Sequence, residues 1–284
     1  MIIWLASYPK SGNTFVRSLL ASYFFTKDGN FNFDSLRFIG QFPDFKFFEQ
    51  ANIELTHDKE IFKNYLKVQE SINNKDKNTV RILKTHSTMH DVGGYKFTDL
   101  NNSLGAIYIV RDPRNVLRSY ANHMQFSEEE ASNALISYRS LVADQKGSKA
   151  SSKTTTLLGN WGSHYQTWKS FKKVNKYMLI KYEDLVQETE KNLIKILEFI
   201  HSISRTKFDL DKTKLIKTIE STSFENLKKM EEKEGFDEGM EIAGKKVTFF
   251  KYGPKNDAYK NLTSETLNKI EKNFEVEMKE LGYL

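Results

Sequence analysis

The sequence predicts an α/β fold in which a central parallel β-sheet is flanked by helices. Short apolar runs recur along the chain, and segments with apolar residues at helical spacing lie between them. Such alternation of strands and helices favours parallel strands joined by right-handed crossovers. The 284 residues contain no internal repeat and no linker-like segment, so we expect a single domain over residues 1–284.

Four apolar runs are the expected strands. The first is bounded by Pro9, and the third, Ala-Ile-Tyr-Ile-Val, contains no charged residue, which is typical of a strand covered on both faces. The four runs are residues 1–6, 80–84, 106–110 and 178–182.

Helices are expected after these strands. Phe15 and Leu19 begin the helical spacing that follows the first strand, and Thr263 is a suitable cap for a last helix that ends at Gly282. The other expected helices lie around residues 113–124, 134–143, 161–171 and 189–203.

Three segments are expected to lack regular structure. Residues 145–156 are rich in Ser, Lys and Thr, which predicts a mobile loop, and residues 228–246 combine dense charge with three glycines, which predicts a flexible flap. Residues 31–48 hold seven phenylalanines without a clear period. Core packing is the favoured interpretation of this stretch, and an apolar wall of a substrate pocket is the alternative.

Composition narrows the classes of partner. Forty-three basic and 37 acidic residues give a net charge of +6, which suits a small anionic ligand but is too low for a surface that coats nucleic acid. The absence of cysteine excludes disulfides, thiolate metal sites and a Cys nucleophile. Every apolar run is too short to cross a bilayer, so we expect a cytoplasmic protein without a membrane partner.

The first strand is followed by Ser-Tyr-Pro-Lys-Ser-Gly-Asn-Thr-Phe, which we expect to bind a phosphate group. Free N–H groups and the positive end of the helix dipole meet where a helix begins after a strand. Gly12 allows close approach of the backbone, Lys10 adds a positive charge, and the remaining donors are Ser11, Asn13 and Thr14. A simple turn with an exposed lysine is the less favoured alternative.

This strand–loop–helix unit is P-loop-like, but it is not a Walker A loop. That motif needs a glycine, four residues and then Gly-Lys-Ser/Thr. Here Lys10 precedes Ser-Gly and no earlier glycine is present, which disfavours ordinary use of ATP or GTP.

Lys84-Thr85-His86 ends the second expected strand, at the sheet edge where parallel sheets bind ligands. A neutral imidazole there could accept a proton from an attacking hydroxyl, and Lys84, two residues earlier, would lie on the same face and balance charge on a transferred group. His90 is close enough in sequence to compete for this role, and an ordinary packed histidine is the simpler alternative.

Arg111 follows the third expected strand directly, and Ser119 lies about two turns along the next helix. The planar guanidinium of Arg111 suits bidentate contact with a second phosphate group, although an ion pair with Asp112 is an alternative. Two separated anion sites on neighbouring strands imply a ligand with phosphates at both ends.

Together these segments resemble the sulfotransferases that use 3'-phosphoadenosine 5'-phosphosulfate. The first loop is similar to that family's Tyr-Pro-Lys-Ser-Gly-Thr-Thr-Trp, residues 109–120 to its 3'-phosphate motif, and residues 84–86 to its catalytic-base segment. Residues 182–185 and 222–224 are similar to segments that contact the nucleoside, and residues 250–261 to the late Arg-Lys-Gly motif. The resemblance spans almost the whole chain.

The resemblance implies sulfuryl transfer to a hydroxyl or amine of a small acceptor, with His86 as general base, Lys10 and Lys84 as catalytic cations, and no metal ion. The implied co-substrate is 3'-phosphoadenosine 5'-phosphosulfate. The implied donor-binding residues are Lys10, Ser11, Gly12, Asn13, Thr14, Phe15, Arg111, Ser119, Tyr182, Thr222, Phe224, Lys251 and Gly253.

The chain departs from the family pattern in places. Phe15 replaces the usual tryptophan, so adenine stacking should be weaker, and Tyr252 follows Lys251 where two basic residues are usual. The phosphosulfate loop begins at residue 7, which favours the cytosolic branch. The oligomeric state and the acceptor stay open.

Two other functions are compatible with the same residues. A P-loop kinase-like phosphotransferase would use a nucleoside triphosphate and magnesium, for which Asp112 is the only obvious carboxylate at a strand end. A non-catalytic nucleotide-binding protein would bind the same nucleotide and transfer nothing.

Overall fold

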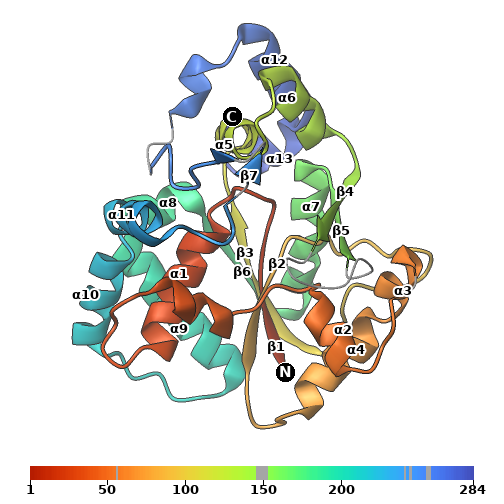
Figure 1. Cartoon of the computed structure of the whole chain (residues 1–284), viewed down its shortest axis with the longest axis vertical. Coiled ribbons are helices and arrows are strands. Elements are labelled where there is room, and N and C mark those ends of the chain that lie inside the picture. The colour runs from red at the N-terminus through yellow and green to blue at the C-terminus, as the bar shows by residue number, and fades with distance from the viewer. Residues whose placement is uncertain (56, 145–152, 240, 243–244, 254–256) are drawn as a thin grey trace.

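Four parallel strands in the order β2-β1-β3-β6 form the centre of the molecule (Figure 1). The structure is a computed structural model that describes residues 1–55, 57–144, 153–239, 241–242, 245–253 and 257–284. Each of the four predicted strands is confirmed, within a few residues at the ends. They are β1 (Ile2–Ser7), β2 (Arg81–Thr85), β3 (Ser103–Val110) and β6 (Tyr177–Lys181).

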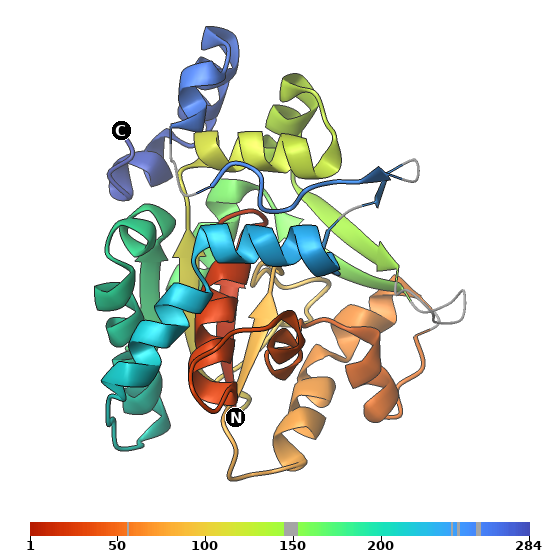
Figure 2. The ribbon, with the colours of Figure 1, turned by 60° about the vertical axis from the view of Figure 1, so that its left-hand side comes forward.

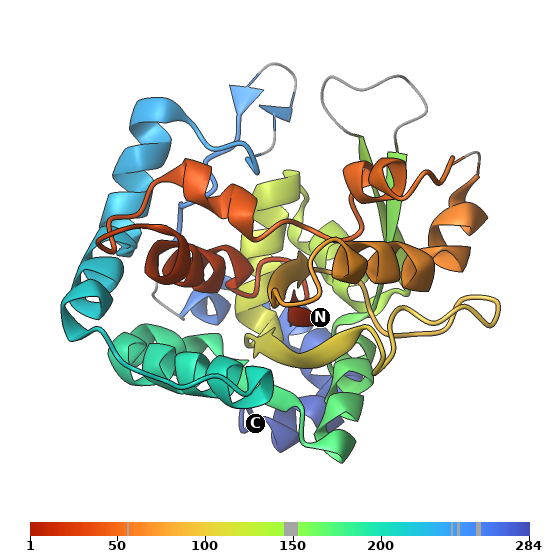
Figure 3. The ribbon, with the colours of Figure 1, turned by 90° about the horizontal axis from the view of Figure 1, so that it is seen from below.

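All six residues of β1 are buried, because helices cover both faces of the sheet (Figure 3). One face packs against helices that follow β1 and β6, and the other against helices from the middle and the end of the chain. The first group is α1 (Asn13–Phe25), α8 (Tyr182–Gln187), α9 (Thr189–Ser204), α10 (Lys212–Ser221) and α11 (Phe224–Glu234), with the 3₁₀ turn η1 (Phe33–Phe38).

The second group contains the helices on the opposite face and those near the carboxyl ends of the strands. It comprises α2 (Phe45–Gln50), α3 (Asp58–Lys63), α4 (Tyr65–Asn74), α5 (Pro113–Met124), α6 (Glu128–Ile136), α7 (Trp161–Trp168), α12 (Ser264–Asn273), α13 (Glu275–Glu280) and the 3₁₀ turns η2 (Lys169–Val174) and η3 (Ala258–Asn261).

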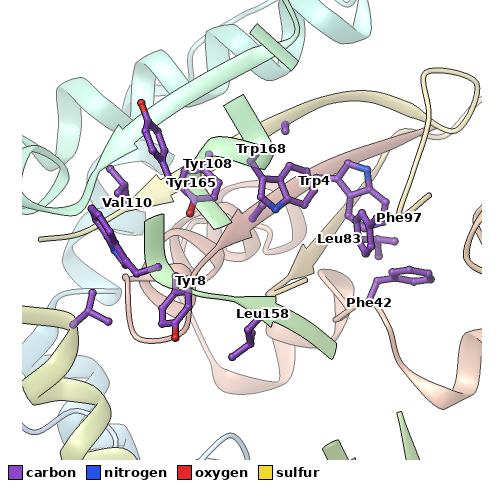
Figure 4. Packing of buried hydrophobic residues seen from close by; sticks show 14 of the residues in the cluster. Trp4, Tyr8, Phe42, Leu83, Phe97, Tyr108, Val110, Leu158, Tyr165 and Trp168 are labelled. Atoms are coloured by element: carbon purple, nitrogen blue, oxygen red, sulfur yellow. The ribbon is translucent and has the colours of Figure 1, made fainter. Parts of the chain in front are cut away.

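Trp4 lies in the middle of an aromatic core on that second face (Figure 4). Its ring centroid is 5.0 Å from that of Phe97 and 5.6 Å from that of Phe42, and its indole N–H donates to Ser103 Oγ over 2.7 Å. Phe42 and Phe48 belong to this core, which confirms core packing as the role of these phenylalanines of residues 31–48. Burial of such rings supplies much of the driving force for folding.

The predicted helix over residues 134–143 is wrong in its second half. Helix α6 ends at Ile136, and the chain then forms the antiparallel hairpin of β4 (Arg139–Asp144) and β5 (Lys153–Gly159) (Figure 2). The run of three threonines in β5 explains the strand, because β-branched residues favour extended backbone. Of the predicted mobile loop, residues 145–152 lie outside the described residues, and residues 153–156 are strand.

The predicted flap over residues 228–246 is also wrong at its start. Residues 228–234 continue α11, which buries Leu227 against the core, and the short strands β7 (Glu241–Ile242) and β8 (Lys245–Lys246) pair farther on. Residues 240 and 243–244 lie outside the described residues. The last helix is capped by Thr263 as predicted, but it is interrupted at Phe274 between α12 and α13.

Candidate functional site

The loop between β1 and α1 is held in a conformation that few residues tolerate. Gly12, the cap of α1, has φ 101°, and Lys10 has φ 64°, which is unusual for a residue with a side chain. The side-chain amide of Asn13 donates to Leu5 O and Ser7 Oγ, at 3.0 and 3.1 Å, and so ties the loop back to β1. Strained backbone of this kind persists where the surrounding structure fixes it, often at functional sites.

Tyr182, the first residue of α8, packs directly onto Gly12. A Cβ atom at position 12 would lie 2.2 Å from Tyr182 Cδ2, so only glycine fits. The guanidinium carbon of Arg111 lies 4.4 Å from the centroid of the Tyr182 ring, and its Nη1 donates to Lys10 O over 3.4 Å. The ends of β1, β3 and β6 thus place one glycine, one aromatic ring and one guanidinium in contact.

These groups border a cavity of about 780 Å³ at the carboxyl edge of the sheet. Most of the residues singled out in the sequence line it: Lys10, Gly12, Asn13, Thr14, Phe15, Lys84, His86, Arg111, Ser119, Tyr182, Phe224, Lys251 and Gly253.

Ser11 and Thr222 do not line the cavity. Ser11 is buried, and its hydroxyl has no hydrogen-bond partner among the described residues. The Thr222 hydroxyl donates to Thr218 O over 2.7 Å, so it is used within α10. A buried unpartnered hydroxyl is costly, which makes Ser11 a candidate donor to a ligand at the loop.

His86 is fixed in one orientation. Its Nδ1 lies 2.7 Å from Ser7 O, and because a carbonyl can only accept, we place the ring proton on Nδ1 and the lone pair on Nε2. Burial, together with the charge of Lys84, lowers the pKa of His86 to about 3. The ring is therefore neutral and able to accept a proton. His90 instead pairs with Thr88 Oγ1 at 3.0 Å and does not line the cavity.

Lys10 is in an environment that opposes its charge. Its Nζ lies 3.5 Å from the ring centroid of Phe249, and burial, aided by the nearby charges of Lys84 and Arg111, lowers the pKa of Lys10 to about 7. The pKa of Lys84 is also lowered by burial, against the opposing effect of Glu238. An anion bound among these cations would restore their usual pKa values.

Sequence analysis missed three charged or titratable residues at this site. The Glu238 carboxylate accepts from Lys84 Nζ over 3.0 Å and from Thr14 Oγ1 over 3.3 Å, and it is paired with Arg17. His123 lines the cavity on α5, with its ring 5.8 Å from that of Phe249, and burial lowers its pKa to about 3.

The cavity has an apolar part as well as a charged one. Of residues 31–48, only Gln41 lines it, so these phenylalanines do not form its wall. Tyr120, Met124 and Leu141 contribute apolar surface instead.

No metal centre is visible in the part of the chain that the structure describes: no three His, Asp or Glu side chains there are close enough together to hold an ion. Asp112 caps α5 by accepting from Arg114 N over 2.9 Å and pairs with the Arg114 guanidinium at 2.7 Å. Among the described helices, none is both long and apolar enough to span a membrane.

Comparison with known proteins identifies the family. The sequence model of the sulfotransferase domain matches residues 2–282. The chain belongs to the sulfotransferase domain family. This sulfotransferase-family chain is 24% identical over 201 residues to sulfotransferase 2A2 of Rattus norvegicus, a match that covers 70% of the chain and 64% of the rat protein, slightly less than two thirds.

Two solved structures share the fold of this sulfotransferase-family chain. Mouse sulfotransferase SULT7A1 complexed with PAP has a TM-score of 0.59 at 18% identity, over 98% of this chain and 84% of the mouse chain. Retinol dehydratase in complex with androsterone and inactive cofactor PAP has a TM-score of 0.61 at 16% identity, over 98% of this chain and 80% of the other. At these identities the likeness shows the α/β architecture with its central parallel sheet.

Proposed function

We propose that this chain transfers a sulfuryl group from 3'-phosphoadenosine 5'-phosphosulfate to a hydroxyl or amine of a small acceptor. Membership in the sulfotransferase domain family supports the reaction class. The observation that carries the proposal is that a single cavity joins the anion-binding loop, the Arg111–Ser119 pair and a neutral, oriented His86. The product of such a donor is adenosine 3',5'-bisphosphate (PAP), which two solved relatives bind.

The donor would be held at both of its anionic ends. Lys10 and the N–H groups of residues 11–14 would bind the 5'-phosphosulfate, because the start of α1 is favourable to negative charge. Arg111 and Ser119 would bind the 3'-phosphate, and Lys251 with Gly253 would close over it.

The adenine would lie between two aromatic rings. Phe15 and Phe224 both line the cavity, and Gly253 lies close to the second ring, since a Cβ there would be 3.4 Å from Phe224 Cε1. Tyr182 would contact the base from α8. Because the hydroxyl of Thr222 is used within α10, we assign the contact predicted for it to the neighbouring Ser223, which lines the cavity.

Transfer would proceed in line at sulfur. The acceptor O–H or N–H proton passes to Nε2 of His86 as the new bond to sulfur forms, and the bond from sulfur to the bridging oxygen breaks to release PAP. Lys10 and Lys84 would stabilise the charge that develops on the bridging oxygen and the sulfuryl group. Tyr120, Met124 and Leu141 would favour an acceptor with an apolar body.

The decisive experiment is an acceptor screen with labelled donor and mass analysis. We expect one acceptor class to gain about 80 Da, the mass of SO3, with no loss of rate in EDTA. Binding of PAP without transfer to any acceptor would favour the non-catalytic alternative. A magnesium requirement with a nucleoside triphosphate as donor would favour the phosphotransferase, for which Asp112 is poorly placed because it is paired with Arg114.

A further inference from the structure

The carboxylate of Glu238 lies within the loop that we assign to the donor. Glu238 follows α11, 224 residues after Thr14 in sequence, yet its Oε2 accepts from Thr14 Oγ1 and from Lys84 Nζ. Figure 2 shows the segment that follows α11 crossing above the carboxyl edge of the sheet. The side chain is 28% exposed and lines the cavity.

Arg17 holds this carboxylate from the other side. Its guanidinium is buried in α1, pairs with Glu238 and donates through Nη2 to Leu36 O over 2.9 Å. Burial alone would raise the pKa of Glu238, but Lys84 and Arg17 lower it well below its usual range, so the group is an anion. Two buried cations thus depend on one carboxylate for their charge balance.

The donor's 5' end and Glu238 have overlapping requirements. Thr14 and Lys84 are both assigned to the phosphosulfate, and each already contacts Glu238. Two anions at one site repel each other strongly in a cavity shielded from water. Exchange of one anion for the other, in contrast, leaves Arg17 and Lys84 paired throughout.

We propose that Thr14, Arg17 and Lys84 form one anion subsite, which Glu238 and the 5'-phosphosulfate end of the donor occupy in turn. Donor binding then displaces Glu238. This inference rests on the proposed function, because it takes the donor to be a nucleotide with a 5'-terminal anion. It makes Glu238 a specificity-determining residue: a nucleotide without a 5' anion cannot replace the carboxylate on the two cations.

The test compares two nucleotides on three proteins. PAP carries a 5' anion, and adenosine 3'-monophosphate does not. Binding of each to the wild type, to Glu238→Gln and to Glu234→Gln is measured by calorimetry. Glu234 is a matched control, because it is exposed at the end of α11 and its replacement changes the net charge equally. We expect Glu238→Gln to bind PAP about tenfold more tightly, with less than about a twofold change for the monophosphate.

Each outcome decides the question. Unchanged or weaker PAP binding by Glu238→Gln would overturn the inference, and would mean that Glu238 stays beside the donor and positions Lys84. Equal tightening of both nucleotides, or tightening by Glu234→Gln as well, would indicate a general effect of charge and would also overturn it. If Glu238→Gln fails to fold, Glu238→Ala carries the same expectation. Failure of the wild type to bind PAP at all would instead refute the proposed function, and this inference with it.

Discussion

At the scale of single residues, Lys10 is in an environment that penalises its charge. It is buried, it faces Phe249, and the charges of Lys84 and Arg111 are near. Its pKa of about 7 means that about half of the molecules carry an uncharged Lys10 at neutral pH. Such a lysine gains much from an anionic ligand, because the ligand restores the protonated form.

PAP binding should therefore take up a proton above pH 7. A bound anion raises the pKa of Lys10, so the affinity should fall as pH rises above 7, by up to about tenfold per pH unit. Calorimetry in buffers of different ionisation enthalpy measures the proton uptake directly. Lys10→Met should bind PAP weakly and without this pH dependence. The same proton uptake in Lys10→Met would assign the titration to another group.

His86 and His90 provide a direct comparison of two histidines. His86→Ala should lower kcat about 100-fold and leave PAP affinity within about twofold of the wild type, because Nε2 acts on the acceptor and not on the nucleotide. His90→Ala should retain most of the turnover, since this side chain does not line the cavity. Steady-state kinetics with a saturating donor measures both. The reverse pattern would transfer the role of base to His90.

The residues that sequence analysis missed differ in how well they could have been found. His123 lies four residues after Ser119 on a predicted helix, so helical spacing already places it on the same face. Glu238 gives no such signal, because its partners lie more than 150 residues away and the contact depends on the path of a connecting segment. Sequence patterns report local geometry well and such long-range pairings poorly.

At the scale of elements, the β1–α1 loop is where a single methyl group should do most harm. Gly12→Ala must place its Cβ within 2.2 Å of the Tyr182 ring at φ 101°. We expect a loss of about 2–4 kcal/mol in the free energy of unfolding, with much weaker PAP binding. Urea unfolding followed by fluorescence measures the first, and calorimetry the second.

Gly93→Ala separates backbone strain from this clash. Gly93 also has a positive φ, 58°, but no atom lies within 4 Å of a Cβ built there. Its replacement should cost only the left-handed backbone term, about 1 kcal/mol, without loss of PAP binding. Equal costs at the two positions would show that Tyr182 moves aside easily and that its contact with Gly12 does not fix the loop.

The strands that carry the site were predictable because helices cover both sides of them. The run at the end of β3 is apolar on both faces and leads straight into Arg111, so the sequence places this guanidinium at the sheet edge. The β4–β5 hairpin was not predictable in the same way. Residues 134–143 contain alanines and leucines that suit a helix, and only pairing with the threonines of β5 makes residues 139–144 a strand.

At the scale of the whole molecule, three histidines are held neutral within the fold. Burial is the main cause in each case, and it lowers the pKa values of His86, His123 and His164 to about 3. Their pKa in the unfolded chain is near 6.5. The unfolded chain therefore binds protons below pH 6.5 that the folded chain does not, and this difference couples stability to pH.

Stability should fall as the pH is lowered from 6.5 to 5. The contribution of each neutral histidine is fully present above its unfolded pKa of 6.5 and is lost progressively toward its folded pKa of about 3. Each should add a slope of about 1 kcal/mol per pH unit in this window, where carboxylates of the unfolded chain are still mostly ionised. The free energy of urea unfolding, measured at half-unit steps of pH, gives the total slope.

Two variants assign that slope. His164→Gln should remove about one third of it, whatever its effect on stability at pH 7, because one of the three proton-binding differences is gone. His57→Gln, at an exposed position before α3, should leave the slope unchanged. A slope that His164→Gln does not reduce would mean that His164 can take up its proton within the fold, most simply by local opening around its partner Tyr108.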